Sequence, residues 1–550
     1  MSYLTRDRAR LLGLLLLAGA LYLPRLNGDW YYLYGEEATG LSLVLSLGSG
    51  QGYADLSLPG APPHVREPFL FYFLVSLLYR LFGFNLWVFK SLVVVSALLF
   101  GPLAFLLFRK LASPRIAFLA ALLTVAAPAL VDYAAFFRPD PLANTLFFAA
   151  LFLLERYREQ ERAFTPLALL GAGCLLAAYL VRSTGLAIAL AWPLALALEP
   201  ARPARLSLNL KKALLVLVPF ALGFGLWEHR NATAAAASGL TYSGRYFLDA
   251  APDSLTIMAE DFHAPQHPPW PQATLAQFPV RILHQSLYYA DSALQYLLNW
   301  TPGPASPRLV ETLLLLLFAL VLLGGVASEW RRRSLAALSL PFYLLAITAW
   351  PMRAPRQAFT FLPFILLYGL LGLERLLTLA QRRLPRLPTA AATAAVAILL
   401  LANYLYGDLR IFRQARRVQD LPRLEIGPGF YARIFSPGRR DSAQALLWAR
   451  RHLPPDAVLM FHSHPPCYLI SQRHCSSIPY EADVKKVRDY LMASPVDYVL
   501  VDNWGKEYPG GPGQFSLRFL EPTLAAFPQD FEQVHQEGQT AAIYRVKKSF

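Results

Sequence analysis

Two adjacent carboxylates, Glu36 and Glu37, are the first residues in the chain whose types and setting suit catalysis. They follow an aromatic run at residues 30–34 and precede an apolar stretch in which free solvation is unfavourable. Neighbouring carboxylates in such a setting are costly unless they are paired or used, and either one could act as a general base. On a helix they would point about 100° apart, so only one could face a given substrate. The structural alternative is that they begin a helix, where negative charge is favourable.

A third acidic residue, Asp140, lies between two prolines in the sequence Arg138-Pro139-Asp140-Pro141. An aspartate that caps a helix, with proline at the first helical position, would account for this pattern by structure alone. A functional interpretation requires that Asp140 and Arg138 lie on the same side of the protein as the first two carboxylates. The elements that position these residues therefore decide between the two interpretations.

The composition excludes a soluble protein. Of the 550 residues, 55% are hydrophobic and only 16% are charged, whereas soluble chains carry roughly a quarter charged residues. The excess of 51 Lys and Arg over 36 Asp and Glu would suggest nucleic acid as a partner of a soluble protein. In a membrane protein, loop arginines that set orientation and meet anionic lipid headgroups explain this excess better. We therefore predict a polytopic α-helical membrane protein with no nucleic-acid partner.

Apolar runs long enough to cross a bilayer occur throughout the first four hundred residues. Each crossing needs about 20 apolar residues, because the hydrocarbon core is about 30 Å thick and a helix rises about 1.5 Å per residue. We predict about eleven transmembrane helices, at residues 10–26, 87–108, 116–134, 141–155, 164–181, 184–198, 213–228, 309–328, 335–350, 357–374 and 389–406. A further apolar segment at residues 68–83 is shorter and carries Arg80 near its end.

The basic residues decide whether residues 68–83 cross the membrane. If the N-terminus is cytoplasmic and this segment lies in the interface, every dense basic cluster falls on the cytoplasmic side, at residues 109–115, 156–162, 202–212, 331–333 and 375–386. If the segment crosses, all five clusters fall outside, against the positive-inside rule. We therefore predict an amphipathic helix on the outer surface. The outer parts are then a first loop at residues 27–85, a large loop at 229–308 and a tail at 407–550.

The tail has the sequence pattern of a small soluble domain. Helical stretches at residues 441–452 and 481–492 alternate with an apolar run at 457–461 and a strand at 496–501. This alternation predicts a C-terminal extracytoplasmic α/β domain at residues 407–550, next to a transmembrane domain at residues 1–406. Cys467 and Cys475 are eight positions apart in it, which allows a disulfide if the domain faces an oxidising compartment.

Three arginines then lie on the outer side, where the positive-inside rule disfavours them. Arg182 follows the fifth predicted crossing, and Arg353 and Arg356 lie between the ninth and the tenth. An anion at that depth, such as a lipid phosphate, would explain them. The alternative is that their side chains snorkel to the headgroups.

These features together resemble the GT-C glycosyltransferases that use polyprenyl-phosphate sugars, the protein O-mannosyltransferase and aminoarabinose transferase group. The likeness covers most of residues 1–375. It rests on the order and spacing of five motifs: YGEE at 34–37, EPFLFY at 67–72, RLFG at 80–83, RPDPLA at 138–143 and RQAFTFLP at 356–363. The family often has Asp-Glu where this chain has Glu36-Glu37, which leaves open which of the two is the working carboxylate.

The resemblance implies an inverting glycosyltransferase in the inner (plasma) membrane. It would move a hexose or pentose from a polyprenyl-phosphate carrier to an acceptor protein, lipid or polysaccharide on the outer face. Glu36 or Glu37 would take the proton of the acceptor. Asp140 would orient the base or the acceptor, or help to hold a divalent cation if the reaction uses one as a cofactor.

The resemblance also implies residues that would bind the substrates. Positive charge on the departing lipid phosphate is needed, and the resemblance implies four candidates for it: Arg356, Arg353, Arg182 and Arg138. Three further residues are candidates for contacts with the substrates: Tyr34, His64 and Glu67.

A lipid-linked sugar transporter or flippase is the alternative function. It would place charged residues at the middle of the bilayer and contain inverted repeats with broken helices. The charged residues predicted here lie instead at helix ends on one face, beside large outer loops. That arrangement favours an enzyme that works at the interface.

Overall fold

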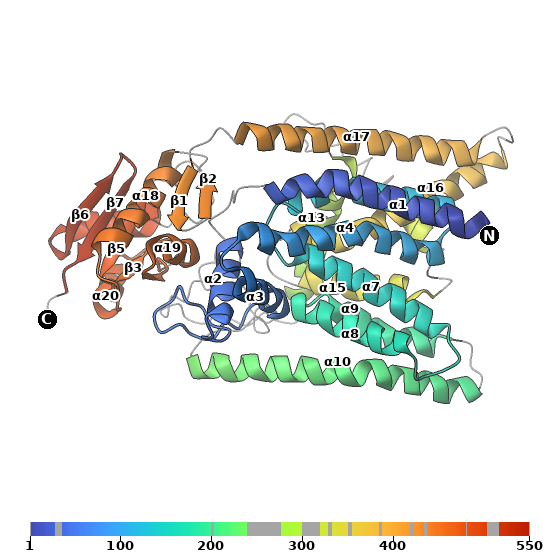
Figure 1. Cartoon of the computed structure of the whole chain (residues 1–550), viewed down its shortest axis with the longest axis horizontal. Helices are drawn as coiled ribbons and strands as arrows, with labels where there is room; N and C mark the ends of the chain where they lie inside the picture. Colours follow the sequence, from blue (N-terminus) through green and yellow to red (C-terminus); the bar gives the residue numbers. More distant parts are fainter. Residues whose placement is uncertain are drawn as a thin grey trace.

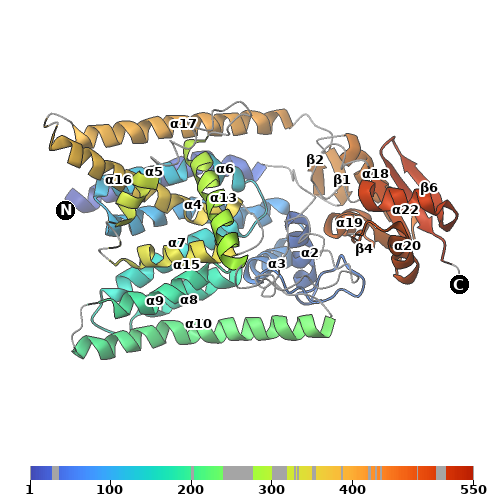
Figure 2. The same cartoon turned by 180° about the vertical axis from the view of Figure 1, so that it is seen from behind.

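The computed structural model describes most of the chain, at residues 2–27, 36–199, 203–238, 277–299, 319–327, 330, 333–349, 355–383, 385, 388–418, 423–427, 430–433, 437–479, 481–502 and 516–548. A bundle of roughly parallel and antiparallel helices makes up one part, and a sheet with flanking helices lies beyond one end of it (Figure 1). The N-terminus lies at the opposite end of the bundle from this sheet (Figure 2).

Five described helices are long and apolar enough to cross a membrane. They lie within α1 (Ser2–Tyr22) with its 3-10 extension η1 (Leu23–Asn27), α4 (Leu86–Leu111), α10 (Pro203–Ser238), α16 (Leu362–Gln381) and α17 (Thr389–Val418). The other bundle helices are α5 (Pro114–Val125), α6 (Pro128–Tyr133), α7 (Asp140–Arg158), α8 (Pro166–Val181), α9 (Gly185–Ala197), α13 (Gln277–Leu298) and α15 (Leu335–Ala349). Residues 319–327 of the predicted crossing at 309–328 are helical as well, and the rest of it lies outside the described residues.

The exposed surface of α10 shows why this chain needs a bilayer. Leu206, Leu210, Leu214, Leu222 and Leu226 are all exposed and form a stripe along the helix at intervals of four or eight residues. A row of exposed leucines along one helix face is suited to lipid and not to water. The chain is an integral membrane protein.

Several predicted boundaries are wrong for identifiable reasons. α10 runs through Ser238, about ten residues into the loop predicted at 229–308, because five of residues 229–238 are alanine, the strongest helix former. α13 lies in the same predicted loop. The crossing predicted at 116–134 is divided into α5 and α6 before Pro128, since proline disfavours helical backbone in the residue before it.

The basic loops gather at the end of the bundle that holds the N-terminus. Arg109 in the last turn of α4 pairs with Asp7 at 3.1 Å, and the Lys212 ammonium donates to the carbonyl oxygen of Arg158 at 2.9 Å. Arg158 in turn donates to the carbonyl of Arg333 at 2.9 Å. Four of the predicted basic clusters therefore contribute contacts at one and the same end.

Two short helices, α2 (Glu36–Gly48) and α3 (Leu70–Phe82), lie at the other end of the bundle, next to the sheet (Figure 1). α3 corresponds to the segment predicted to lie in the interface. It buries Phe71, Tyr72 and Val75 and exposes Leu81 and Phe82, so it is amphipathic. Its position in the membrane interface stays a prediction.

A five-stranded sheet forms the core of the C-terminal part. Its strand order is β4-β3-β5-β7-β6, in which β3 is parallel to β4 and β5, and β7 is antiparallel to β5 and β6. The strands are β3 (Val458–Met460), β4 (His474–Ser476), β5 (Tyr498–Asp502), β6 (Phe531–Glu537) and β7 (Ala541–Val546). The helices around it are α18 (Pro437–His452), α19 (His464–Ser471), α20 (Val484–Ala493) and α22 (Glu521–Ala526), and a hairpin of β1 (Arg423–Gly427) and β2 (Phe430–Arg433) precedes them.

Candidate active site at the end of the bundle

Four separate segments bring three carboxylates and three guanidinium groups together. The segments are the start of α2, residues 138–140 at the start of α7, the residue that follows α8 and the 3-10 helix η2 (Pro355–Thr360). The ion pairs formed are Glu36 with Arg356, Glu37 with Arg138, and Asp140 with Arg182. Each pair joins residues from two different segments, so the packing of the bundle creates the cluster.

Glu36 is the accessible carboxylate of the cluster. Both terminal nitrogens of the Arg356 guanidinium donate to its two carboxylate oxygens, and Nη1 of Arg138 lies 3.9 Å from Oε2. Its side chain is 40% exposed. Burial acts to raise the pKa of Glu36, but the charges of Arg356 and then Arg138 outweigh it and lower this pKa to about 2. Glu36 is therefore ionised and bound to Arg356.

Glu37 lies beneath it and is only 2% exposed. Its Oε1 accepts a hydrogen bond from Nε of Arg138 at 2.5 Å, while Oε2 has no hydrogen-bond partner among the described residues. Burial raises the pKa of Glu37 against the opposing charge of Arg138. Arg138 also donates to the Tyr133 hydroxyl at 3.2 Å and stacks over the rings of Tyr133 and Phe136. Glu37 thus holds a guanidinium that is fixed on three sides.

Asp140 does not cap α7, so the structural alternative given for it from the sequence is not what the structure shows. It is the first residue of the helix, Pro139 occupies the cap position, and no side-chain cap bond forms. The buried carboxylate is instead directed to the part-buried Arg182, whose Nη1 lies 3.2 Å from Oδ1, because a charged partner is available at the α8 terminus. One turn further along α7, the Asn144 amide oxygen accepts from the Thr360 hydroxyl at 2.7 Å, which ties α7 to the segment that carries Arg356.

His64 and Glu67 form a neighbouring pair of their own. Nε2 of His64 lies 2.6 Å from Oε2 of Glu67, and the Tyr53 hydroxyl donates to the carbonyl of Glu67 at 2.8 Å. Arg230 near the end of α10 donates to the carbonyls of His64 and Tyr53 and stacks over the Tyr53 ring. Their proposed contact with substrate stays a prediction. Tyr34 and Arg353 lie outside the described residues.

Sequence reasoning missed the residues that support the cluster. Thr360 lies in the motif at 356–363, but nothing in that motif indicates its contact with Asn144, 216 positions away. Tyr133 and Arg230 lie outside the five motifs, and their contacts with Arg138 and His64 could not be read from the sequence. For metal binding, no group of three or more His, Cys, Asp or Glu is positioned to hold an ion in the part of the chain that the structure describes. A divalent cation that Asp140 helps to hold stays a prediction.

Comparison with solved structures identifies the architecture. The chain aligns with ArnT from Cupriavidus metallidurans bound to undecaprenyl phosphate at 12% identity and a TM-score of 0.50, covering 99% of this chain and 98% of that one. An Archaeoglobus fulgidus oligosaccharyltransferase tethered with an acceptor peptide aligns at 14% identity and a TM-score of 0.54, covering 96% and 72%. The chain has the GT-C fold. Mycobacterial arabinofuranosyltransferase AftD aligns at 14% identity and a TM-score of 0.50, with 99% of this chain and 42% of that chain covered.

A family comparison agrees with the GT-C fold. Residues 66–227 match the family described as dolichyl-phosphate-mannose-protein mannosyltransferase, a segment that runs from before α3 into α10 and contains Arg138, Asp140 and Arg182. No curated protein matches the sequence. The resemblance to the GT-C glycosyltransferases predicted from the motifs is confirmed.

Proposed function

We propose that the chain is an inverting glycosyltransferase that moves a sugar from a polyprenyl-phosphate carrier to a hydroxyl or similar acceptor. The observation that carries this proposal is the two-pronged ion pair of Arg356 with Glu36 at a partly open end of a GT-C bundle. A planar guanidinium that binds two carboxylate oxygens has the geometry to bind two phosphate oxygens instead. ArnT, which shares this fold, binds undecaprenyl phosphate.

Exposure selects Glu36 over Glu37 as the general base. A base must come within hydrogen-bond reach of the acceptor proton. Glu36 is 40% exposed, whereas Glu37 is 2% exposed beneath Arg138. Glu37 then serves to hold Arg138, which adds a second positive charge 3.9 Å from Glu36.

The donor itself would activate the base. When the donor phosphate replaces Glu36 as the partner of the Arg356 guanidinium, Glu36 loses the positive charge that lowers its pKa most. The pKa of Glu36 then rises from about 2. The freed carboxylate accepts the acceptor proton, and the acceptor atom bonds to the anomeric carbon. The bond from that carbon to the phosphate oxygen breaks, and its electron pair stays on the phosphate, where Arg356 stabilises the new charge.

Asp140 and Arg182 would complete the donor site. Arg182, at the end of α8, lies 3.2 Å from Asp140, and the charge of Asp140 also acts on Arg356. Thr360 and Asn144 hold η2 against α7 and so restrict the position of Arg356. We assign Asp140 the role of orienting Arg182.

The site would face the extracytoplasmic side of the plasma membrane, the inner membrane where a cell has two. The basic loops share the opposite end of the bundle, which the positive-inside rule assigns to the cytoplasm. The disulfide between Cys467 and Cys475 supports an oxidising compartment for the sheet domain at the site end.

The proposal is tested with the purified full-length chain in lipid nanodiscs and a panel of radiolabelled undecaprenyl-phosphate sugars. Envelope extracts from cells without the gene serve as acceptor, and mass spectrometry identifies the product. We expect label to move from lipid to acceptor with the wild-type chain and not with Glu36→Gln. Movement of the intact labelled lipid between leaflets of reconstituted vesicles, without transfer, would instead establish a flippase and overturn the proposal.

A further inference from the structure

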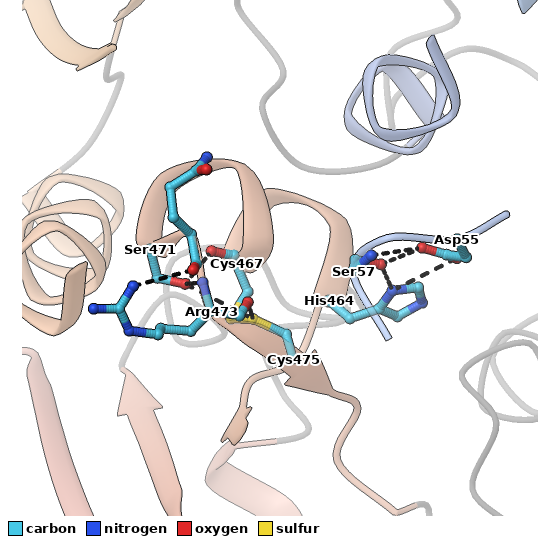
Figure 3. The surroundings of a disulfide bond; sticks show 8 residues. Asp55, Ser57, His464, Cys467, Ser471, Arg473 and Cys475 are labelled. Atoms are coloured by element: carbon cyan, nitrogen blue, oxygen red, sulfur yellow. Dashed lines mark hydrogen bonds and ion pairs between the residues drawn. A yellow bond between two sulfur atoms is a disulfide. The ribbon is translucent and has the colours of Figure 1, made fainter. Parts of the chain in front are cut away.

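Two segments more than four hundred residues apart meet at Ser57, in the first outer loop (Figure 3). Nδ1 of His464, the first residue of α19, lies 2.6 Å from the Ser57 hydroxyl oxygen. That hydroxyl also bonds to Oδ1 of Asp55. All three side chains are buried, so this cluster is a contact between the loop and the sheet domain and no open site.

Proton counting fixes the direction of these bonds. Burial acts to raise the pKa of Asp55, but the charges of His464 and His64 and the Ser57 hydrogen bond outweigh it and lower this pKa. Asp55 is therefore ionised and only accepts, so the single hydroxyl proton of Ser57 goes to Asp55. Nδ1 of His464 must then carry a proton and donate it to the Ser57 oxygen. Burial lowers the pKa of His464 to about 4, which keeps this ring neutral.

The backbone makes a second contact at the same residue. The amide of Cys475 donates to the carbonyl of Ser57 at 2.6 Å. Cys475 lies in β4, an edge strand of the five-stranded sheet, so the first loop takes up an amide that the sheet leaves unpaired. Ser57 is thus bound through both its side chain and its backbone.

The disulfide joins the two donors to Ser57. Cys467 lies in α19, which begins with His464, and its sulfur bonds to Cys475 of β4 (Figure 3). Arg473, between these elements, donates to the carbonyls of Arg450 at 2.9 Å and Leu453 at 2.7 Å and so ties the disulfide loop to α18. Reduction of the disulfide would remove the covalent cross-link between α19 and β4 and leave them joined covalently only through residues 472–473.

α2 lies directly against this junction. It packs on α19, and Leu41 and Val44 of α2 share one buried hydrophobic cluster with Cys467 and Ile470. The first residue of α2 is Glu36. The carboxylate that we propose as the base is therefore attached to a helix that the sheet domain holds in place.

We propose that Ser57, His464 and the Cys467–Cys475 disulfide, which we name the Ser57 latch, position α2 for sugar transfer and make turnover depend on the disulfide. The inference rests on the proposed transferase function. His464 is a positioning residue that acts through α2. Arg356 and Arg182 lie on other elements, so loss of the latch lowers kcat and leaves the KM for the donor unchanged.

The latch is tested on the full chain in nanodiscs with wild type, His464→Ala and His464→Asn, each with and without a reductant. Hydrogen exchange is followed by mass spectrometry in peptides that cover residues 53–65 and α2. In His464→Ala the buried Ser57 hydroxyl, which donates to Asp55, loses its hydrogen bond from His464. We therefore expect about tenfold faster exchange in both peptides and about tenfold lower kcat. The KM for the donor should stay within about twofold of the wild-type value. His464→Asn should restore both values, since its amide nitrogen can donate from nearly the same place.

Reductant should reproduce the effect of His464→Ala in the wild type. The paired variant Cys467→Ser/Cys475→Ser keeps the remaining cysteine, Cys174, and should not respond to reductant, which makes it the matched control. Unchanged exchange in α2 in His464→Ala would overturn the latch whatever the activity. Faster exchange with unchanged kcat would overturn its role in catalysis. If the wild type transfers no sugar but exchange rises in the variant, the docking contact is supported and the proposed function is the one overturned.

Discussion

Replacement of Glu36 by glutamine removes one negative charge and the capacity to accept a proton, while it keeps the size of the side chain. In the structure Glu36 contacts Arg356 through both oxygens, and a glutamine can still accept a hydrogen bond from that guanidinium through its amide oxygen. The substitution therefore tests the base and leaves the local packing in place.

The expected effects on rate and on stability differ widely in size. Loss of a general base lowers turnover by about 10²- to 10⁴-fold, or about 3–5 kcal/mol of transition-state stabilisation. The side chain of Glu36 is 40% exposed, so loss of its ion pair should cost only about 1 kcal/mol of folding free energy. Binding of the donor should strengthen slightly, because Arg356 no longer has to leave a carboxylate before it binds the phosphate.

Three measurements on wild type and Glu36→Gln separate these effects: kcat for sugar transfer, affinity for undecaprenyl phosphate, and the midpoint of thermal unfolding. Glu37→Gln is the matched control, since it makes the same chemical change one residue away at a buried position. A kcat for Glu36→Gln within threefold of wild type, or a larger loss in Glu37→Gln with intact folding, would refute the assignment of Glu36 as the base.

Three further predictions concern Glu37, Arg356 and His464. Glu37→Ala removes the buried carboxylate that holds the part-buried Arg138 guanidinium and should lower the unfolding free energy by about 1–3 kcal/mol, and an unchanged melting temperature would contradict this. Arg356→Ala should weaken the binding of undecaprenyl phosphate at least tenfold in a titration, whereas equal affinity would make Arg356 structural. The His464 pKa is lowered from 6.5 to about 4 by burial, beside Asp55 and His64. The unfolded chain therefore binds more protons in that window, and stability should fall by up to about 3 kcal/mol as the pH drops from about 6.5 to 4. A wild-type loss no larger than that of His464→Asn would contradict the assignment.

Two features could be predicted from the sequence: the helices, and the location of the site residues at one end of the bundle. The helices follow from the apolar runs, and the common location follows from the alternating direction of successive crossings. Apolar runs specify helices wherever lipid surrounds them, and α4, α8, α9 and α15 lie within a few residues of their predicted ranges. Successive crossings alternate in direction, so the ends of the third and fifth crossings had to lie on one side. That reasoning brought Asp140 and Arg182 to the end of the bundle that holds Glu36.

The pairing within the site could not be predicted, because it depends on how the helices rotate and tilt against one another. Arg356 and Glu36 are 320 positions apart, and Arg138 and Glu37 are 101 apart. Any of the outer arginines could have met any of the carboxylates at the level of topology. The contact between Ser57 and His464 is even less predictable. No pattern in the sequence of the first loop or of the C-terminal domain indicates which residues of the one contact the other.

The charge balance of the cluster explains why arginines also occur at the end of the bundle opposite the basic loops. Three carboxylates and three guanidinium groups cancel in the site as described. A phosphodiester donor adds one negative charge. In the proposed reaction the phosphate gains a second charge as Glu36 takes the acceptor proton and becomes neutral, so the total charge stays constant during transfer. Arg356, which contacts Glu36 before the donor binds, then stabilises the charge that has moved to the phosphate, and no ion has to enter or leave a site of low dielectric constant during the chemical step.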